Sequence, residues 1–203
     1  TIGDGRVTCT TVHGSAASLT QIPAANIVGV CTSGLGNASG AFGQGITVHD
    51  WWGLSADLSV AQGENTVTAN WFRHNTINGT IGSAMSQSSG IFTFAQTGWY
   101  HCTWWMYISG NTNSPWNEMV LELSHNNGSN WTNYQYAQGY LVSGETRYTT
   151  NCTAHTFSIP SISGDSTRKI RFSINQQANS SVATAGSSSQ SHTGFTIVKI
   201  AEQ

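Results

Sequence analysis

The chain has 203 residues, of which 38% are hydrophobic and only 8% are charged, and its formal net charge is −2. Its seven Lys and Arg residues are too few and too scattered to form the positive surface that binds nucleic-acid phosphates or an anionic membrane. No apolar run approaches the roughly 18 residues that span a bilayer, so membrane insertion is not expected. Eight Trp, seven Phe and six Tyr residues predict a buried core rather than a disordered chain.

Residues 1–46 differ in composition from the rest, because Gly, Ala, Ser and Thr dominate them and Trp is absent. Their one apolar stretch, residues 19–30, is interrupted by Pro and Gly, which predicts extended chain docked on another structure. We interpret residues 1–46 as an arm, a shaft remnant or an anchor, and residues 47–203 as a separate domain. The predicted anchoring residues are Ile22, Pro23, Asn26 and Ile27.

From residue 46 onward, runs of β-branched and aromatic residues recur between turn signals, and no segment keeps the apolar period of a helix. This pattern predicts an all-β domain of about ten short antiparallel strands, arranged as a sandwich or jelly roll. The candidate strands are residues 46–52, 58–60, 66–72, 90–94, 98–109, 118–124, 131–138, 146–159, 168–175 and 194–200.

The strongest candidate strand, residues 98–109, is apolar on both faces, because side chains alternate along a strand. The face that suits a core carries Tyr100, Cys102, Trp104, Met106 and Ile108. The opposite face carries Trp99, His101, Thr103, Trp105 and Tyr107. A sheet with two apolar faces is usually covered on both, so we predict that this second face is an interface with other copies of the chain. The alternative is burial under the N-terminal arm.

The four cysteines, Cys9, Cys31, Cys102 and Cys152, form no Cys-x-x-Cys pair, so a structural zinc site is not expected. Three disulfide pairings are possible on paper. We favour the alternative that the cysteines are buried small hydrophobic residues. Cys102 lies inside an apolar strand, and a domain of this size needs no disulfide.

The sequence does not indicate catalysis. Glu118 and Glu122 share one face of a strand about 13 Å apart, beyond either glycosidase spacing, and we expect both to be solvated. His49, Asp50 and His101 lack the Gly-x-Ser-x-Gly turn of a hydrolase. The histidines match no metal motif such as His-x-x-x-His. We therefore predict a protein that is not an enzyme and has no cofactor and no metal.

Two predicted loops combine aromatic rings with amides, the pair Trp116 and Asn117 and the group Asn130, Trp131 and Tyr134. Saccharide sites stack the apolar side of a sugar on an aromatic face while amides bond its hydroxyl groups. We predict these residues as candidate glycan contacts. The alternative is that the Trp residues are partly buried in hairpins or subunit contacts.

Residues 124–131, Ser-His-Asn-Asn-Gly-Ser-Asn-Trp, resemble the Asp-box hairpin Ser-x-Asp-x-Gly-x-x-Trp of sialidases, with Asn126 in the Asp position. We expect Asn126 to bond the turn backbone, Gly128 to adopt a positive φ and Trp131 to pack beneath the turn. The sequence lacks the arginine cluster of sialidases, so the resemblance implies an architecture and not that activity.

Residues 89–100, Ser-Gly-Ile-Phe-Thr-Phe-Ala-Gln-Thr-Gly-Trp-Tyr, resemble the signature of the jelly-roll superfamily that includes the complement globular head and tumour-necrosis-factor ligands. Residues 191–200 are similar to the last strand of that family, so the resemblance covers roughly residues 47–201. It implies a jelly roll that assembles as a homotrimer. Two departures, Cys102 at the family's third aromatic position and the missing closing Tyr, imply repacked trimer contacts.

Residues 50–58 and 79–92 resemble structural proteins of marine tailed bacteriophages, and residues 19–29 are similar to segments of phage fibre and virion proteins. Together they imply a virion surface or appendage protein, such as a tail-fibre knob that contacts other virion proteins and a host-surface glycan. One alternative is a capsid decoration or cement protein whose arm clamps capsomers by strand addition. An alternative of another class is a secreted lectin or complement-like module of a eukaryote.

Overall fold

The computed structural model describes residues 45–59, 61–74, 80–83, 85–110, 114–141, 147–177, 182–190 and 192–203. All of them belong to the second of the two compact units of the chain, Gln44–Gln203. The predicted arm lies outside the described residues except for its last two positions, and so do its anchoring residues Ile22, Pro23, Asn26 and Ile27. Within the described ranges, no helix is long and apolar enough to cross a membrane.

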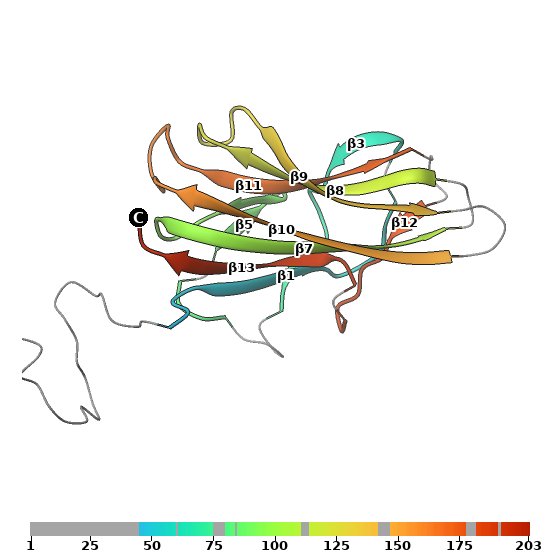
Figure 1. The fold of residues 1–203 in the computed structure, drawn as a ribbon, viewed down its shortest axis with the longest axis horizontal. Coiled ribbons are helices and arrows are strands. Elements are labelled where there is room, and N and C mark those ends of the chain that lie inside the picture. The colour runs from blue at the N-terminus through green and yellow to red at the C-terminus, as the bar shows by residue number, and fades with distance from the viewer. Residues whose placement is uncertain are drawn as a thin grey trace, which may run out of the picture. The chain divides into compact units, whose positions relative to one another are not determined.

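The described residues form two antiparallel sheets that pack as a sandwich (Figure 1), which confirms the predicted all-β class. Sheet A has seven strands and sheet B has six. Sheet A contains β2 (Leu58–Ser59), β12 (Val182–Thr184), β7 (Gly98–Gly110), β13 (Gly194–Ala201), β1 (His49–Leu54), β4 (Trp71–Arg73) and β10 (Arg147–Ile159). Sheet B contains β5 (Ser86–Ser88), β6 (Ile91–Thr93), β11 (Lys169–Gln176), β8 (Ser114–Ser124), β9 (Thr132–Leu141) and β3 (Gly63–Thr66).

Strand β7 organises sheet A. It pairs along its whole length with β10, from Gly98 opposite Ile159 to Gly110 opposite Arg147. Along its other edge β13 pairs with residues 99–105 and β12 with residues 108–110. The first strand, β1, pairs with the last strand, β13, so the two ends of the domain meet in the middle of one sheet.

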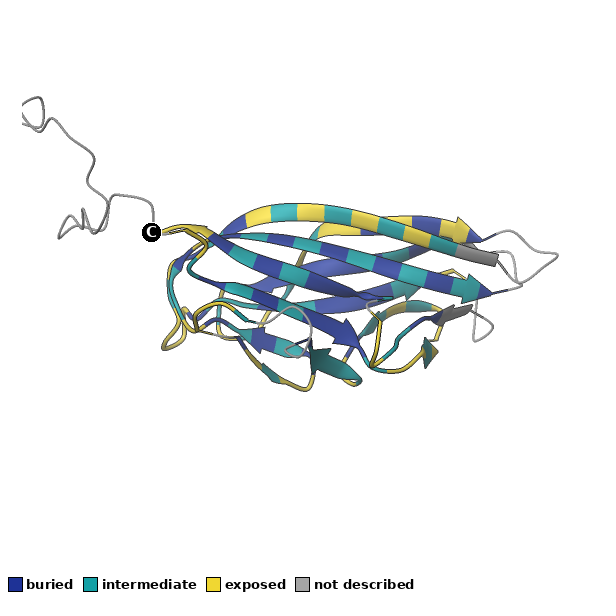
Figure 2. Ribbon diagram, turned by 90° about the horizontal axis from the view of Figure 1, so that it is seen from below, coloured by how far each residue is buried: buried dark blue, intermediate teal, exposed yellow. Residues whose placement is uncertain are grey.

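The predicted inward face of β7 is confirmed, because the side chains at positions 100, 102, 104, 106 and 108 are at most 1% exposed. Figure 2 shows the alternation of more and less buried residues as bands along the long strands. The rings of Phe92 and Phe172 lie 4.8 Å and 4.7 Å from that of Phe195, centroid to centroid. The Trp104 indole N–H donates to the backbone oxygen of Met119 at 2.9 Å, which joins β7 of sheet A to β8 of sheet B.

The candidate strand at residues 66–72 is divided in the structure. Strand β3 ends at Thr66 in sheet B, and β4 begins at Trp71 in sheet A. Asn70 has a φ of 64°, and the Trp71 indole donates to the Val67 oxygen at 2.9 Å, so the chain turns between the sheets here. Strands β5 and β12 were not predicted, because they are short and consist of small or polar residues apart from one Val.

The cysteine prediction is confirmed at one described position and wrong at the other. Cys102 is fully buried, and burial raises the pKa of its thiol. Cys152 is exposed because it lies on the outer face of the edge strand β10, opposite Trp105. Both thiols are free. Cys9 and Cys31 lie outside the described residues.

Candidate functional site

The outer face of sheet A carries the aromatic residues predicted on β7. Trp99 is 44% exposed, and His101, Thr103, Trp105 and Tyr107 are half-buried. All five follow the strict alternation of β7, because the residues between them point into the core. This part of the prediction is therefore confirmed as an outward-facing aromatic row on a long strand.

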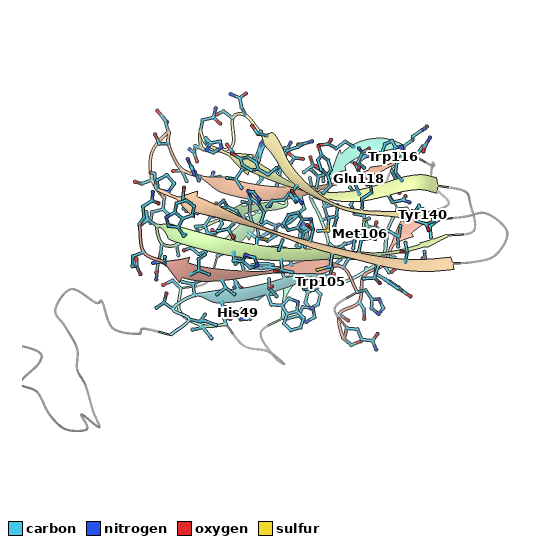
Figure 3. The ribbon with its side chains drawn as sticks, viewed as in Figure 1. His49, Trp105, Met106, Trp116, Glu118 and Tyr140 are labelled. Carbon is cyan, nitrogen blue, oxygen red and sulfur yellow. The ribbon has the colours of Figure 1, made fainter. Side chains whose placement is uncertain are left out.

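Trp105 belongs to an aromatic cluster that extends across β1 to the end of β4. Its ring centroid lies 6.1 Å from that of Trp51, which in turn lies 5.1 Å from that of His74. His74 packs at 4.2 Å against Phe72. Gly53 makes room for the histidine ring, because a Cβ at that position would lie 2.8 Å from Nε2 of His74. Figure 3 shows Trp105 on the side of the sandwich formed by β13 and β1.

His74 brings a buried polar atom to this cluster. The residue is 5% exposed, and its Nε2 has no hydrogen-bond partner among the described residues. Burial lowers the pKa of the imidazole, which favours its neutral form. An unpaired buried nitrogen costs about 1–3 kcal/mol, and a partner from outside the described chain would remove that cost.

Asp50 and His101, which the sequence analysis had weighed as catalytic groups, have separate partners. Asp50 is fully buried and accepts hydrogen bonds from Arg73 at 2.9 and 3.2 Å and from the Met85 backbone N–H at 2.9 Å. His101 instead has its Nδ1 3.0 Å from the hydroxyl of Thr156 on β10. Asp50 therefore has a structural role, linking β1 to β4 and to the segment before β5.

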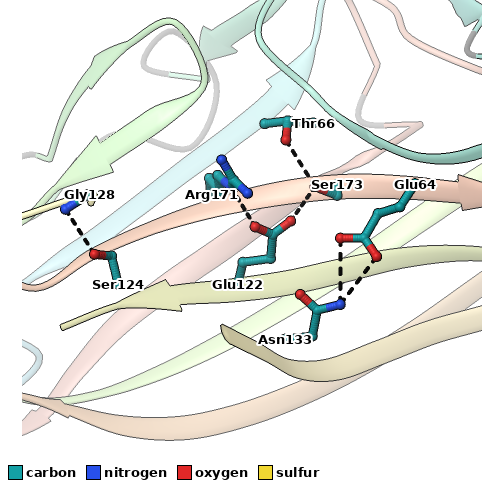
Figure 4. A network of polar contacts seen from close by, with 8 residues as sticks. All are labelled: Glu64, Thr66, Glu122, Ser124, Gly128, Asn133, Arg171 and Ser173. Carbon is teal, nitrogen blue, oxygen red and sulfur yellow. Dashed lines mark hydrogen bonds and ion pairs between the residues drawn. The ribbon is translucent and has the colours of Figure 1, made fainter. Parts of the chain in front are cut away.

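The outer face of sheet B carries a polar network, shown in Figure 4. The expectation that Glu122 is solvated is wrong, because it is only 1% exposed and accepts hydrogen bonds from Arg171 and Ser173. Glu64 of β3 accepts from the Asn133 amide at 3.2 Å on the same face. Burial raises the pKa of Glu64, and the negative charge of Glu122 adds to the rise, although the Asn133 amide opposes it.

A hollow of about 320 Å³ lies on this same face, lined by Trp116 and Glu118 of β8, Gln138 of β9 and Asn175 of β11. The two carboxylate oxygens of Glu118 accept from the amides of Gln138 and Asn175, each at 3.1 Å. Tyr140 of β9 is 68% exposed. Figure 3 shows Trp116, Glu118 and Tyr140 gathered at one end of the sandwich.

The structure separates the predicted glycan contacts. Trp116 lines the hollow, whereas Asn117 is 1% exposed and belongs to the buried side of β8. Asn130 is exposed, and its backbone N–H is bonded within the hairpin turn. Trp131 has a guanidinium group of β11 4.4 Å from its ring, and Tyr134 is half-buried with its hydroxyl 2.7 Å from a histidine nitrogen.

Three residues that line the hollow, Glu118, Gln138 and Asn175, were not predicted as a site. They come together through strand pairing, because Glu118 lies opposite Gln138 on one side and Asn175 on the other. The available sequence signal was the alternation of Tyr136, Gln138 and Tyr140, which puts two aromatic residues and an amide on one face of a strand.

The Asp-box-like hairpin has the expected geometry. The side-chain oxygen of Asn126 accepts from the Asn130 backbone N–H at 2.8 Å, and the Ser124 hydroxyl accepts from that of Gly128 at 2.8 Å. Gly128 has a φ of 93°, and a Cβ added there would lie 3.7 Å from the Trp131 ring. The hairpin thus positions Trp131 at the edge of the polar network.

No family model and no curated protein sequence match this chain. Among solved structures, it is similar to Eiger TNF from S. frugiperda, with a TM-score of 0.56, 12% identity, and coverage of 78% of this chain and 95% of that one. It is also similar to murine APRIL, with a TM-score of 0.50, 12% identity, and coverage of 75% and 98%. The fold is a TNF-like jelly roll. This confirms the predicted fold class. The aromatic face lies on sheet A of this jelly roll, and the face with the hollow lies on sheet B.

Proposed function

We propose that this protein is a non-enzymatic, homotrimeric attachment module of a virion, in which three copies bury the outer faces of sheet A against one another. The aromatic cluster around Trp105 and Trp51 carries the proposal, because so many rings on one sheet face favour a protein partner over water. The Nε2 of His74 at the same cluster, which is buried and has no hydrogen-bond partner among the described residues, supports it. The TNF-like fold is consistent with the homotrimer that the sequence resemblance implies.

The virion setting is supported by the resemblance of residues 50–58 and 79–92 to phage structural proteins. In that setting the trimer is a tail-fibre knob or a capsid-surface protein, and its partners are other virion proteins and a host-surface glycan. Residues 1–46 would serve as its anchor. Weak individual sites gain strength in such an assembly, because many copies on one particle act together.

A secreted binding module is the second candidate, favoured by the likeness to an insect and a murine protein. Secreted proteins keep their cysteines oxidised, whereas Cys152 is exposed with a free thiol. Mass spectrometry of the natural protein under non-reducing conditions separates the two candidates. The virion proposal expects the unmodified mass and a Cys152 thiol that is alkylated once the protein is denatured without reductant, because the trimer covers the outer face of sheet A. Glycan mass or a disulfide at Cys152 would favour the secreted module.

Light scattering of the full chain tests the trimer. The expected mass is three times 21.7 kDa. Trp105→Arg places a charge in the aromatic face and is expected to yield a folded monomer, with β-sheet content checked by circular dichroism. Tyr136→Arg makes the same kind of change on the outer face of sheet B and is expected to leave the trimer intact. A monomeric natural chain, or a trimer that tolerates Trp105→Arg, would contradict the proposal.

A further inference from the structure

We propose that the hollow on the outer face of sheet B binds a neutral saccharide, with Glu118 receiving its hydroxyl groups and Trp116 providing the surface on which a sugar ring stacks. The inference rests on the proposed function, because it names the ligand class of the attachment module. The hollow lies on sheet B and the proposed trimer face on sheet A, so sugar binding and trimer assembly can be measured separately.

Glu118 is held in position before any ligand arrives. Its Oε1 accepts from Gln138 and its Oε2 accepts from Asn175, both at 3.1 Å. Each carboxylate oxygen has two acceptor positions, and contacts with the described residues use one on each oxygen. The two amides also carry carbonyl oxygens, which are acceptors themselves. The hollow is therefore rich in pre-positioned acceptors, which suits a ligand with several hydroxyl donors.

Aromatic surface accompanies these acceptors. Trp116 lines the hollow, and Tyr136 and Tyr140 are 45% and 68% exposed on the same face of β9 as Gln138. Tyr136 and Tyr140 are about 13 Å apart along β9, one on either side of Gln138. An extended ligand that lies along the strand could contact both rings. Aromatic faces next to fixed polar groups are the combination that binds sugar rings. This arrangement favours an oligosaccharide over a single sugar.

Charge selects among saccharides. Glu118 is negative, and Glu64 and Glu122 lie on the same sheet face. Two described cations of β11 share this face: Arg171, which is already bonded to Glu122, and Lys169, which lies six residues along the strand from Asn175. An acidic sugar would therefore meet repulsion, which favours a neutral one. A quaternary ammonium ion is disfavoured too, because such ions are bound by cages of several aromatic rings, and Trp116 is the one aromatic residue among the described residues that line the hollow.

Isothermal titration calorimetry of the full chain tests this inference with four probes. Cellohexaose and chitohexaose represent neutral oligosaccharides, 3′-sialyllactose an acidic one and tetramethylammonium a quaternary cation. We expect at least one neutral hexasaccharide to bind, and the acidic sugar and the cation not to bind. A chain that binds neither neutral hexasaccharide, or that prefers the acidic sugar or the cation, overturns the proposal.

Variants locate the binding. Glu118→Gln keeps the side-chain shape but removes the charge, and is expected to weaken binding at least about tenfold, because hydrogen bonds to a charged group are the stronger ones. Tyr140→Ser changes a 68% exposed residue and is expected to weaken hexasaccharide binding without affecting the fold. Glu202→Gln is the matched control, because this carboxylate is 76% exposed and pairs with Lys199. If the first two variants bind as tightly as the control, the site is wrong.

The outcome also separates this inference from the trimer. Trp105→Arg, on the other sheet, is expected to lose assembly and to keep its affinity for a hexasaccharide. A trimer that binds no neutral sugar overturns the saccharide site and leaves the assembly standing. A monomeric natural chain that binds the sugar overturns the trimer and leaves the saccharide site standing.

Discussion

Trp104 offers a direct measurement of what joins the two sheets. Its indole is fully buried and donates from β7 to the Met119 oxygen of β8 at 2.9 Å. Trp104→Phe removes that bond, worth about 1 kcal/mol, and part of a close-packed ring system, worth about 1–2 kcal/mol. We therefore expect the free energy of unfolding to fall by about 2–3 kcal/mol.

Trp52→Phe is the matched control. Trp52 is 6% exposed, and its indole nitrogen is buried with no hydrogen-bond partner among the described residues. Its replacement loses a similar amount of ring contact, but it also removes an unpaired N–H that costs about 1–3 kcal/mol in the folded state. The two effects oppose each other, so we expect a net loss of about 1 kcal/mol or less.

Urea unfolding followed by circular dichroism at pH 7 measures both variants. Protomer concentrations must be equal, because assembly shifts the apparent stability. The expected result is a lower midpoint for Trp104→Phe than for Trp52→Phe at an unchanged slope. If Trp52→Phe loses as much stability as Trp104→Phe, the cross-sheet bond contributes nothing and the reasoning is refuted.

Gly194→Ala would place a Cβ 2.2 Å from the Trp52 backbone oxygen, so we expect a loss of at least about 2 kcal/mol, read from the thermal midpoint; an unchanged midpoint would disprove the close approach. Because the pKa of Glu64 is raised in the folded state, its contribution to stability falls as pH rises above 4.5; Glu64→Gln should gain stability relative to the natural chain over that range in urea titrations, and a constant difference would refute this. The lowered pKa of His74 makes the unfolded state bind more protons below pH 6.5, so stability decreases as the pH is lowered through that range. In the same urea titrations, His74→Phe should lose less stability on acidification than the natural chain, and an equal loss would count against this reasoning.

Local patterns predicted the parts of the fold that depend on one strand at a time. The long apolar strand β7 was assigned its two faces correctly, because alternation alone determines which side chains point inward. The break between β3 and β4 escaped prediction, because apolar residues continue on both sides of Asn70 and only its positive φ marks the turn.

Contacts between distant strands were beyond this reasoning. Glu122 was expected in water because its own strand alternates, yet its partner Arg171 comes 49 positions later. The hollow likewise combines residues from β8, β9 and β11, and Asn175 comes 57 positions after Glu118. Trp116 was predicted because an aromatic ring stands next to an amide in the sequence. The three polar lining residues become a site only once the register of the sheet is known.

The position of β13 has a consequence for how a new copy is made. This strand is the last of the domain, yet it lies between β7 and β1, where His49 is opposite Val198. Pairing between residues so far apart in the chain is slow to form, and it must wait until residues 194–201 have been synthesised. Until then one edge of the tryptophan-rich β7 stays largely open to other nascent chains. A chain terminated before residue 194 would keep that edge open permanently, so truncated copies should aggregate rather than join finished ones.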